Sequence, residues 1–178
     1  MANQTTDNFA EPMLEQTHQH HVTLSSLGDA KANMLLTISS VTATLCLALL
    51  DNMLYRPALA ILMLFSLVTI FLACFVVIPK VDLTKRLDPD LQLGNPNFNP
   101  LFFGDFHTIR FDKYLTLMEQ VFNNPTLCHE IELREIHGLG QYLAKKKFNT
   151  LRAAYLTFMA GFISAAVVLC ISLMVYYF

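Results

Sequence analysis

Three long runs of apolar residues divide the chain, at 33–50, 57–79 and 153–178, and none of them contains a charged residue. A helix that crosses the hydrocarbon core of a bilayer, ~30 Å thick, needs about 17–25 mostly apolar residues. Each run is close to that length, and the remaining polar segments are too short to cover three such helices in a soluble core. The pattern therefore predicts three transmembrane helices.

The N-terminal arm ahead of the first run also has a helical pattern. Leu14, His21, Leu24, Leu27 and Lys31 fall at spacings of three, four and seven residues, which is typical of one helix face. We expect this arm to continue without a break into the first membrane helix.

The segment 80–152 is predicted to be a small, mostly helical cytoplasmic domain. Its first part contains Pro89, Pro96 and Pro100, which exclude a long helix. The fold class predicted is an all-α membrane protein with three transmembrane helices and this small domain. Its boundaries are an arm at 1–32, a membrane helix at 33–50, an outer turn at 51–56, a membrane helix at 57–79, an irregular loop at 80–109, helices at 110–122 and 126–152, and a membrane helix at 153–178.

Basic residues near the run ends predict the orientation, because cytoplasmic loops carry an excess of Lys and Arg. The outer turn offers Arg56 alone. The N-terminus and residues 80–152 are therefore expected in the cytoplasm, with the C-terminus on the far side. The basic residues on the cytoplasmic side are Lys80, Lys85, Arg86, Lys145, Lys146, Lys147 and Arg152.

Composition and motifs exclude several classes of function. The net charge is −2, whereas proteins that coat nucleic-acid polymers are strongly basic. Glycine-rich nucleotide motifs, HExxH and paired-cysteine zinc spacings are all missing from the sequence. We expect no enzyme activity, no catalytic residue, no metal and no cofactor. His18, His20 and His21 leave metal binding open as an alternative to a polar arm or a helix contact, but it would need further ligands.

The segment 97–106, NFNPLFFGDF, is the strongest candidate for a ligand site. Aromatic faces can stack on a base, polar side chains can bond its edges, and a glycine lets backbone approach a phosphate. Packing of the loop against neighbouring helices is the alternative, and the lysine run 145–147 is either a phosphate clamp or a membrane anchor. The predicted ligand contacts are Asn99, Phe102, Phe103, Gly104, Asp105, Lys145 and Lys147.

Asp29 and Lys31 lie just outside the first run and are two residues apart, so they point to different helix faces. Each needs a partner on another element, and Arg134, Glu135 and the lysine run are candidates. We expect the joint between the domain and the membrane helices to contain Asp29, Lys31, Arg134 and Arg152.

Small and hydroxyl side chains in the first and third runs predict close helix packing, because such faces let helices approach in lipid. They serve either packing within one chain or a homo-oligomer. The second run is bulkier and is expected to face lipid more. The predicted packing residues are Thr37, Ser40, Thr44, Gly161 and Ala165.

Three separated strings resemble one family. They are Asp29-Ala30-Lys31-Ala32 ahead of Leu35-Leu36, then Asn99-Pro100-Leu101-Phe102-Phe103-Gly104-Asp105-Phe106, and Lys147-Phe148 with Leu151-Arg152-Ala153-Ala154-Tyr155. In order and spacing they are similar to the Pycsar membrane effector family, PycTM type, over essentially the whole chain.

The resemblance implies an effector of bacterial antiphage defence in the inner membrane. In such systems a cyclase makes cyclic CMP or cyclic UMP on infection, and the effector responds by impairing the membrane, which stops growth. It implies a small cyclic nucleotide as regulatory ligand and the lipid bilayer as partner. The ligand contacts named in the loop and the lysine run rest on residue chemistry alone. A constitutive membrane scaffold or pore-forming protein, controlled by a protein partner, is the alternative.

Overall fold

A computed structural model gives the fold and describes residues 3–78, 93, 95 and 98–177. The structure is 86% helical, and the described residues contain no strand. Three helices are long and apolar enough to cross a membrane. The prediction of an all-α membrane protein with three such helices is therefore confirmed, while the small cytoplasmic domain and the side on which each polar segment lies stay predictions.

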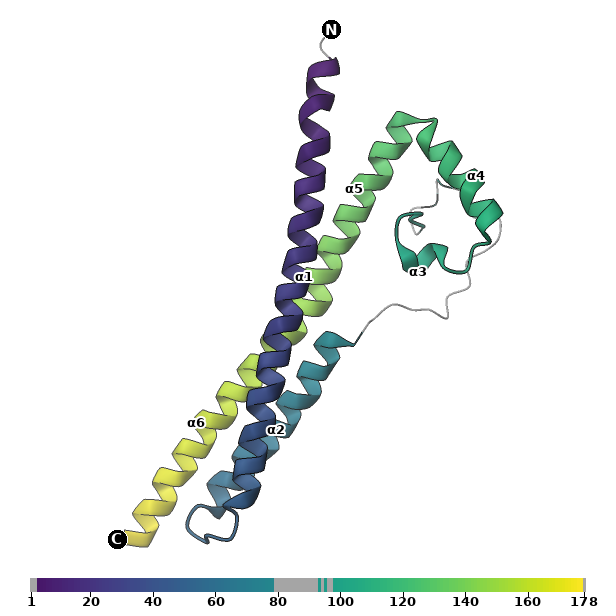
Figure 1. Ribbon diagram of the computed structural model, residues 1–178. Coiled ribbons are helices and arrows are strands. Elements are labelled where there is room, and N and C mark those ends of the chain that lie inside the picture. Colours follow the sequence, from purple (N-terminus) through teal and green to yellow (C-terminus); the bar gives the residue numbers. More distant parts are fainter. Residues whose placement is uncertain (1–2, 79–92, 94, 96–97, 178) are drawn as a thin grey trace. The chain divides into compact units, whose positions relative to one another are not determined.

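Six α-helices and one π-helical segment make up the described chain (Figure 1). They are α1 (Asn3–Ala48), α2 (Arg56–Val77), α3 (Phe103–Phe106), α4 (Phe111–Phe122), α5 (Pro125–Tyr142), the π-helical segment η1 (Leu143–Phe148) and α6 (Asn149–Tyr177). Pro57 lies in the first turn of α2, where its missing N–H leaves no hydrogen bond unmade. At the other end, Ile78 has extended backbone ahead of Pro79, as the residue before a proline prefers.

The chain divides into two compact units. The loop unit comprises Met1–Thr23 and Pro79–Tyr142, and the span unit comprises Leu24–Ile78 and Leu143–Phe178. The chain passes between the units within α1, after α2, and at the start of η1. The predicted basic residues Lys80, Lys85 and Arg86, and the first half of the predicted loop 80–109, lie outside the described residues.

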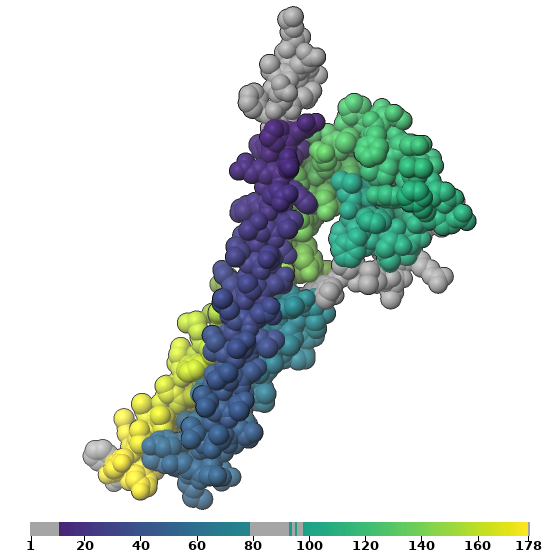
Figure 2. All heavy atoms as spheres, in the orientation of Figure 1, coloured from purple at the N-terminus to yellow at the C-terminus, as the bar shows by residue number. Residues whose placement is uncertain are grey.

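In the span unit, α1, α2 and α6 run side by side (Figures 1 and 2). Ala32, Val76 and Leu151, one from each helix, form a buried cluster against which Phe148 packs. Tyr155 on α6 adds a hydrogen bond from its hydroxyl to the carbonyl oxygen of Lys31 on α1, at 3.4 Å. Packing of apolar side chains from all three helices therefore defines this unit.

The expectation that the second run faces lipid more than the others is wrong. In its most apolar stretch α2 buries 22% of its residues, as α1 does, against 11% for the helix that ends in α6. Gly161 of α6 lies so close to α2 that an added Cβ would be 2.5 Å from Cβ of Phe65. The prediction was based on the average size of the side chains in the second run. The contact face of α2 is instead formed by a narrow stripe of smaller side chains. The buried residues of α2 are Ala58, Ser66, Thr69, Ala73 and Val76.

The other predicted packing residues differ in burial. Ala165 is buried on α6, four residues after Gly161, as expected for one packed face. Thr37 and Thr44 are exposed, and their hydroxyls donate to carbonyl oxygens one turn earlier on α1. Ser40 is half-buried and bonds in the same way to Leu36. The homo-oligomer stays a prediction.

The loop unit has its own apolar core. Phe98 is fully buried together with Leu93, Val121 and Ile131, from the loop, α4 and α5. Burial of apolar surface from three segments is what fixes the loop residues against the helices. One face of α4 supplies this core. Elsewhere on α4, Phe111, Leu115 and Phe122 are exposed.

Candidate functional site

Asn99 is the centre of a polar network in the loop unit. Its side-chain oxygen accepts the Leu101 N–H at 3.0 Å, and its amide group donates to a carboxylate oxygen of Glu135. Its backbone N–H donates to Oδ2 of Asp105 at 3.0 Å, and its carbonyl accepts the Phe102 N–H at 3.1 Å. Asn99 is 8% exposed, so these partners satisfy groups that burial would otherwise leave unpaired.

Arg134 on α5 fastens the loop to the helices. Its guanidinium donates to the carbonyl oxygens of Asn95 and Phe98, at 3.0 and 2.9 Å, and forms an ion pair with Glu130 at 2.8 Å. The planar fork of an arginine suits such several-fold bonding. Arg134, predicted at the joint with the membrane helices, lies instead in the loop unit and binds the loop.

The aromatic residues of the loop divide into two groups. Phe98 is in the core, and Phe106 stacks on Tyr114 with ring centroids 5.1 Å apart. Phe102 and Phe103 are exposed, and their ring centroids lie 5.2 Å apart. The first group packs the loop, and the second forms an exposed aromatic surface.

Gly104 and Asp105 lie in the short helix α3. Gly104 is buried, and the Asp105 carboxylate is used by the Asn99 N–H. Five of the predicted ligand contacts therefore lie together in the loop unit: Asn99, Phe102, Phe103, Gly104 and Asp105.

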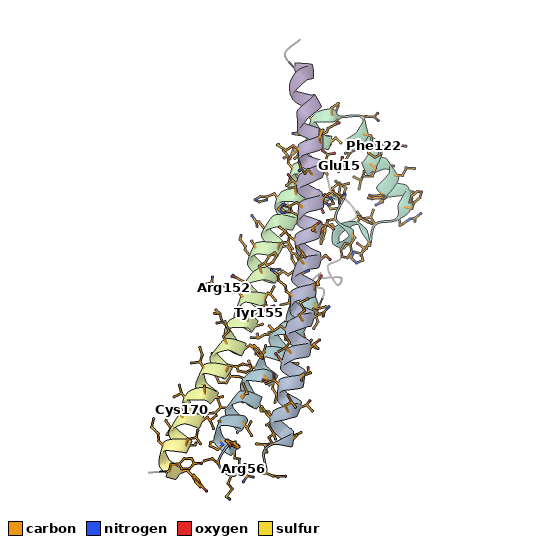
Figure 3. All side chains as sticks on the ribbon, turned by 60° about the vertical axis from the view of Figure 1, so that its left-hand side comes forward. Glu15, Arg56, Phe122, Arg152, Tyr155 and Cys170 are labelled. Carbon is orange, nitrogen blue, oxygen red and sulfur yellow. The ribbon has the colours of Figure 1, made fainter. Side chains whose placement is uncertain are left out.

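A cleft of about 540 Å³ opens beside this loop. The volume is in the range of small-molecule sites. Leu101 of the loop lines it together with α1 and α5, and Figure 3 labels Glu15 on its α1 side. The sequence reasoning missed this cleft, because residues of α1 and α5 distant in sequence form it. Its lining residues are Glu11, Leu14, Glu15, His18, Leu101, Glu132, Glu135 and Ile136.

Glu135 connects the cleft to the Asn99 network. Burial of its carboxyl raises its pKa above the ordinary value, and the negative charge of Asp105 adds to this rise. The positive charge of His18 and the hydrogen bond from Asn99 act in the opposite direction. The net rise of the pKa means that desolvation outweighs the favourable partners.

The cleft offers hydrogen-bond acceptors and few positive charges. Its four glutamates suit amino groups and hydroxyls, and among the described lining residues His18 alone can carry a positive charge. Across the described residues, no group of three or more His, Cys, Asp or Glu side chains is arranged to hold a metal ion. Absence of metal stays an expectation for the whole chain.

The histidine cluster of the arm is split by the helix. His18 lines the cleft, His20 is exposed, and His21 lies against Gly140 of α5. An added Cβ at Gly140 would be 3.3 Å from Cε1 of His21. Gly140 is therefore a point of close approach between α1 and α5.

Lys145 and Lys147, the other two predicted ligand contacts, lie in η1 of the span unit. Lys145 is exposed, whereas Lys147 is 5% exposed. The ammonium of Lys147 forms an ion pair with Oδ2 of Asp29 and donates to Oγ of Ser25, each at 2.8 Å. Among the partners considered for Asp29, the structure thus selects the lysine run.

Lys31 and Arg152 complete the predicted joint residues. Both are exposed. Lys31 contributes its backbone carbonyl to Tyr155. Figure 3 labels Arg152 and Tyr155 along α6.

The sequence profile of the Pycsar effector protein domain matches residues 12–174. That stretch includes the loop, η1, nearly all of the three apolar helices and all but one of the residues that line the cleft. The chain belongs to the Pycsar effector family. Comparisons with curated proteins and with solved structures gave no match. This Pycsar effector is thus a membrane protein with a role in antiphage defence.

Proposed function

We propose that this Pycsar effector is gated by a cyclic pyrimidine nucleotide, cyclic CMP or cyclic UMP, and that it then impairs the bacterial inner membrane without catalysing a reaction. The observation that carries the proposal is the family match over residues 12–174, because that stretch includes both a cleft and the membrane helices. One chain thus holds a candidate sensor and a candidate output. Growth stops before phage are released.

The chemistry of the cleft supports binding of the base and ribose there. A glutamate accepts well from the exocyclic amino group of cytosine, and carboxylates also accept from ribose hydroxyls. Uracil presents an oxygen at the same position, which a carboxylate repels. Glu132 and Glu135 therefore favour cyclic CMP over cyclic UMP, with Phe102 and Phe103 as an exposed aromatic surface in the same unit.

The phosphate is the demanding part of this ligand. Four glutamates disfavour an anion, so we expect the phosphate to lie toward His18 or outside the cleft. Binding changes the membrane helices only if the nucleotide binds one arrangement of the chain more tightly than another.

Calorimetry on the full chain in detergent tests the ligand. We expect heat with cyclic CMP, less with cyclic UMP and none with cyclic AMP. Glu132→Ala should weaken binding by about tenfold or more, since one good hydrogen-bonded contact to a base is worth roughly 1–3 kcal/mol. Glu119→Ala, on an exposed position of α4 outside the cleft, is the matched control. No heat with either pyrimidine nucleotide removes the nucleotide-gated function.

A second candidate function is a membrane scaffold or pore former controlled by a protein partner. The exposed apolar side chains of α4, Phe111, Leu115 and Phe122, favour it, because such a surface fits a protein. In that case Asp105→Ala and Lys145→Ala leave phage protection intact while Gly161→Leu abolishes it. Loss of protection with Asp105→Ala in a folded, membrane-inserted protein favours the nucleotide instead.

A further inference from the structure

Lys147 occupies a socket on α1 made by Ser25, Gly28 and Asp29, which we call the Lys147 socket. Gly28 and Asp29 are three and four residues after Ser25, so the three positions share one side of the helix. Ser25 and Asp29 bind the ammonium, each at 2.8 Å. Gly28 makes room for the stem, because an added Cβ there would be 3.3 Å from Cε of Lys147. A buried ammonium is thus matched in shape and charge.

The segment that carries Lys147 is π-helical, and the π turn directs this side chain toward the buried face of the helix. Leu143, Lys147 and Leu151 are all buried and are spaced by four residues. In a uniform α-helix, eight residues would carry Leu151 about 80° around the axis from Leu143. The wider π turn, with its i→i+5 bonding, brings the three closer to one face. Short π-helical segments are rare in proteins as a whole, and those that do occur often lie at functional sites.

A return of η1 to α-helix would turn α6 by about one residue, or roughly 100°. The close contact of α6 with α2 cannot accept such a turn. At Gly161 even a methyl group would be 2.5 Å from Cβ of Phe65. A turned α6 would present Ala160 or Phe162 there instead, so α2 and α6 would have to separate.

We infer that the Lys147 socket holds η1 in its π-helical register in the resting protein, and that release of Lys147 lets η1 become α-helical and forces α2 and α6 apart. The inference rests on the proposed function for the output of this change, which is loss of membrane integrity. The socket lies where the chain enters the span unit, at Leu143 and next to Leu24. A conformational change passed along the chain at Leu143 or Leu24 would therefore reach the ion pair of Lys147 and Asp29 before the rest of the span unit.

Two variants of the ion pair test the inference in liposomes that hold a fluorescent dye. Lys147→Met removes the ammonium and with it both bonds to α1, those to Ser25 and Asp29. We expect leakage without any nucleotide to rise by more than about tenfold over the wild-type chain, because bonds made by a charged group no longer favour the resting state. Asp29→Asn should act in the same direction, since it takes the ion partner away from the buried ammonium of Lys147. Lys146→Met, at the exposed neighbouring position, is the matched control and should not leak.

Deletion of Ala144, an exposed residue of η1, removes the extra residue of the π turn and keeps Lys147 in its socket. This variant should still bind nucleotide with wild-type heat but should not leak when nucleotide is added. A wild-type leak from the deletion variant overturns the π-to-α step. Gly28→Ala, which only crowds the lysine stem, gives a milder form of the Lys147→Met effect and replaces that variant if it does not fold.

The two proposals fail in different ways. If the wild-type chain binds no cyclic nucleotide but Lys147→Met leaks and Lys146→Met does not, the ligand is wrong and the socket stands. If nucleotide binds and causes leakage while Lys147→Met and Asp29→Asn remain as tight as the wild-type chain without it, the socket does not hold the resting state and the inference is wrong.

Discussion

The two units treat buried polar groups differently. In the loop unit, Asn99 has a partner for its side-chain oxygen, its amide and both backbone groups, and Arg134 makes three bonds. In the span unit, the hydroxyls of Ser39 and Ser66 are buried with no hydrogen-bond partner among the described residues, whereas Nδ1 of His21 is the single such atom described in the loop unit. Directional hydrogen bonds thus specify the loop unit.

Close packing specifies the span unit instead. Its tightest glycine contact is the approach of Gly161 to Phe65, and its buried charged group is the ammonium of Lys147. From this contrast we expect the stability of the loop unit to fall when side chains are shortened, and that of the span unit to fall when side chains are enlarged. Four substitutions test this, in order of falling effect.

Phe98→Ala should have the largest effect and should be confined to the loop unit. Phe98 is fully buried in that core, and loss of a buried phenylalanine costs about 3–5 kcal/mol. Hydrogen exchange read by mass spectrometry should show lost protection over α4 and α5 and unchanged protection over α2 and α6. Equal loss in both units would show that they unfold together.

Gly161→Ala should destabilise the span unit by about 1–3 kcal/mol, as expected when a methyl group is forced into a packed contact. Gly138→Ala is the control, because an added Cβ there would meet no described atom within 4 Å apart from its chain neighbours and the backbone of its own helix. That control should gain stability, since alanine favours a helix over glycine by roughly 1 kcal/mol. Thermal unfolding in detergent measures both, and a neutral Gly161→Ala would show that α2 and α6 separate easily.

Glu135→Gln should change how stability depends on pH. Because the folded-state pKa of Glu135 is raised above its ordinary value of 4.5, the folded chain holds this proton more tightly than the unfolded chain. The contribution of Glu135 to stability is therefore fully present below that ordinary value and is lost as pH rises through the folded pKa. Glutamine stays neutral and its oxygen can still accept from Asn99.

The variant should therefore be the more stable protein at neutral pH, by a small margin that disappears in acid. Unfolding midpoints of both proteins, measured across the acidic to neutral range, give the difference. A margin that grows as the pH falls would contradict the sign. Glu119→Gln, on an exposed position of α4, should show no such pattern.

Ser66→Ala should have the smallest effect, within about 1 kcal/mol in either direction, because its buried hydroxyl has no hydrogen bond to lose in the described chain. Thr69→Ala nearby should cost more, since Thr69 is fully buried and its hydroxyl donates to the Phe65 carbonyl. Thermal unfolding in detergent compares the two. A marked loss with Ser66→Ala would indicate that the hydroxyl has a partner in the working protein, such as a second copy of the chain.

Sequence reasoning succeeded where one segment alone decides the structure. The absence of charge over each apolar run was enough to predict three helices able to span a membrane, whatever their neighbours. The helical pattern of the arm is equally local, and α1 runs from Asn3 to Ala48.

The features that were missed depend on pairs of distant residues. For Asp29 the sequence left Arg134, Glu135 and the lysine run open as partners, and only the folded chain selects Lys147. The π turn that carries Lys147 has no plain signal in LAKKKF, which contains neither glycine nor proline. The glutamates of the cleft are ordinary in sequence and form a site only because α1 and α5 approach each other at Gly140 and His21.

The exposed apolar side chains of α4 also decide how this protein can be handled. Phe111 and Phe122 are 77% and 70% exposed, and apolar surface so open to water promotes association with proteins, membranes or other copies of the chain. A fragment cut out to obtain a soluble sensor would carry this adhesive surface into solution and aggregate through it. Detergent or lipid is therefore needed for α4 as well as for the membrane helices. The intact chain in detergent or lipid is the sample in which weak ligand binding can be measured without interference from aggregation.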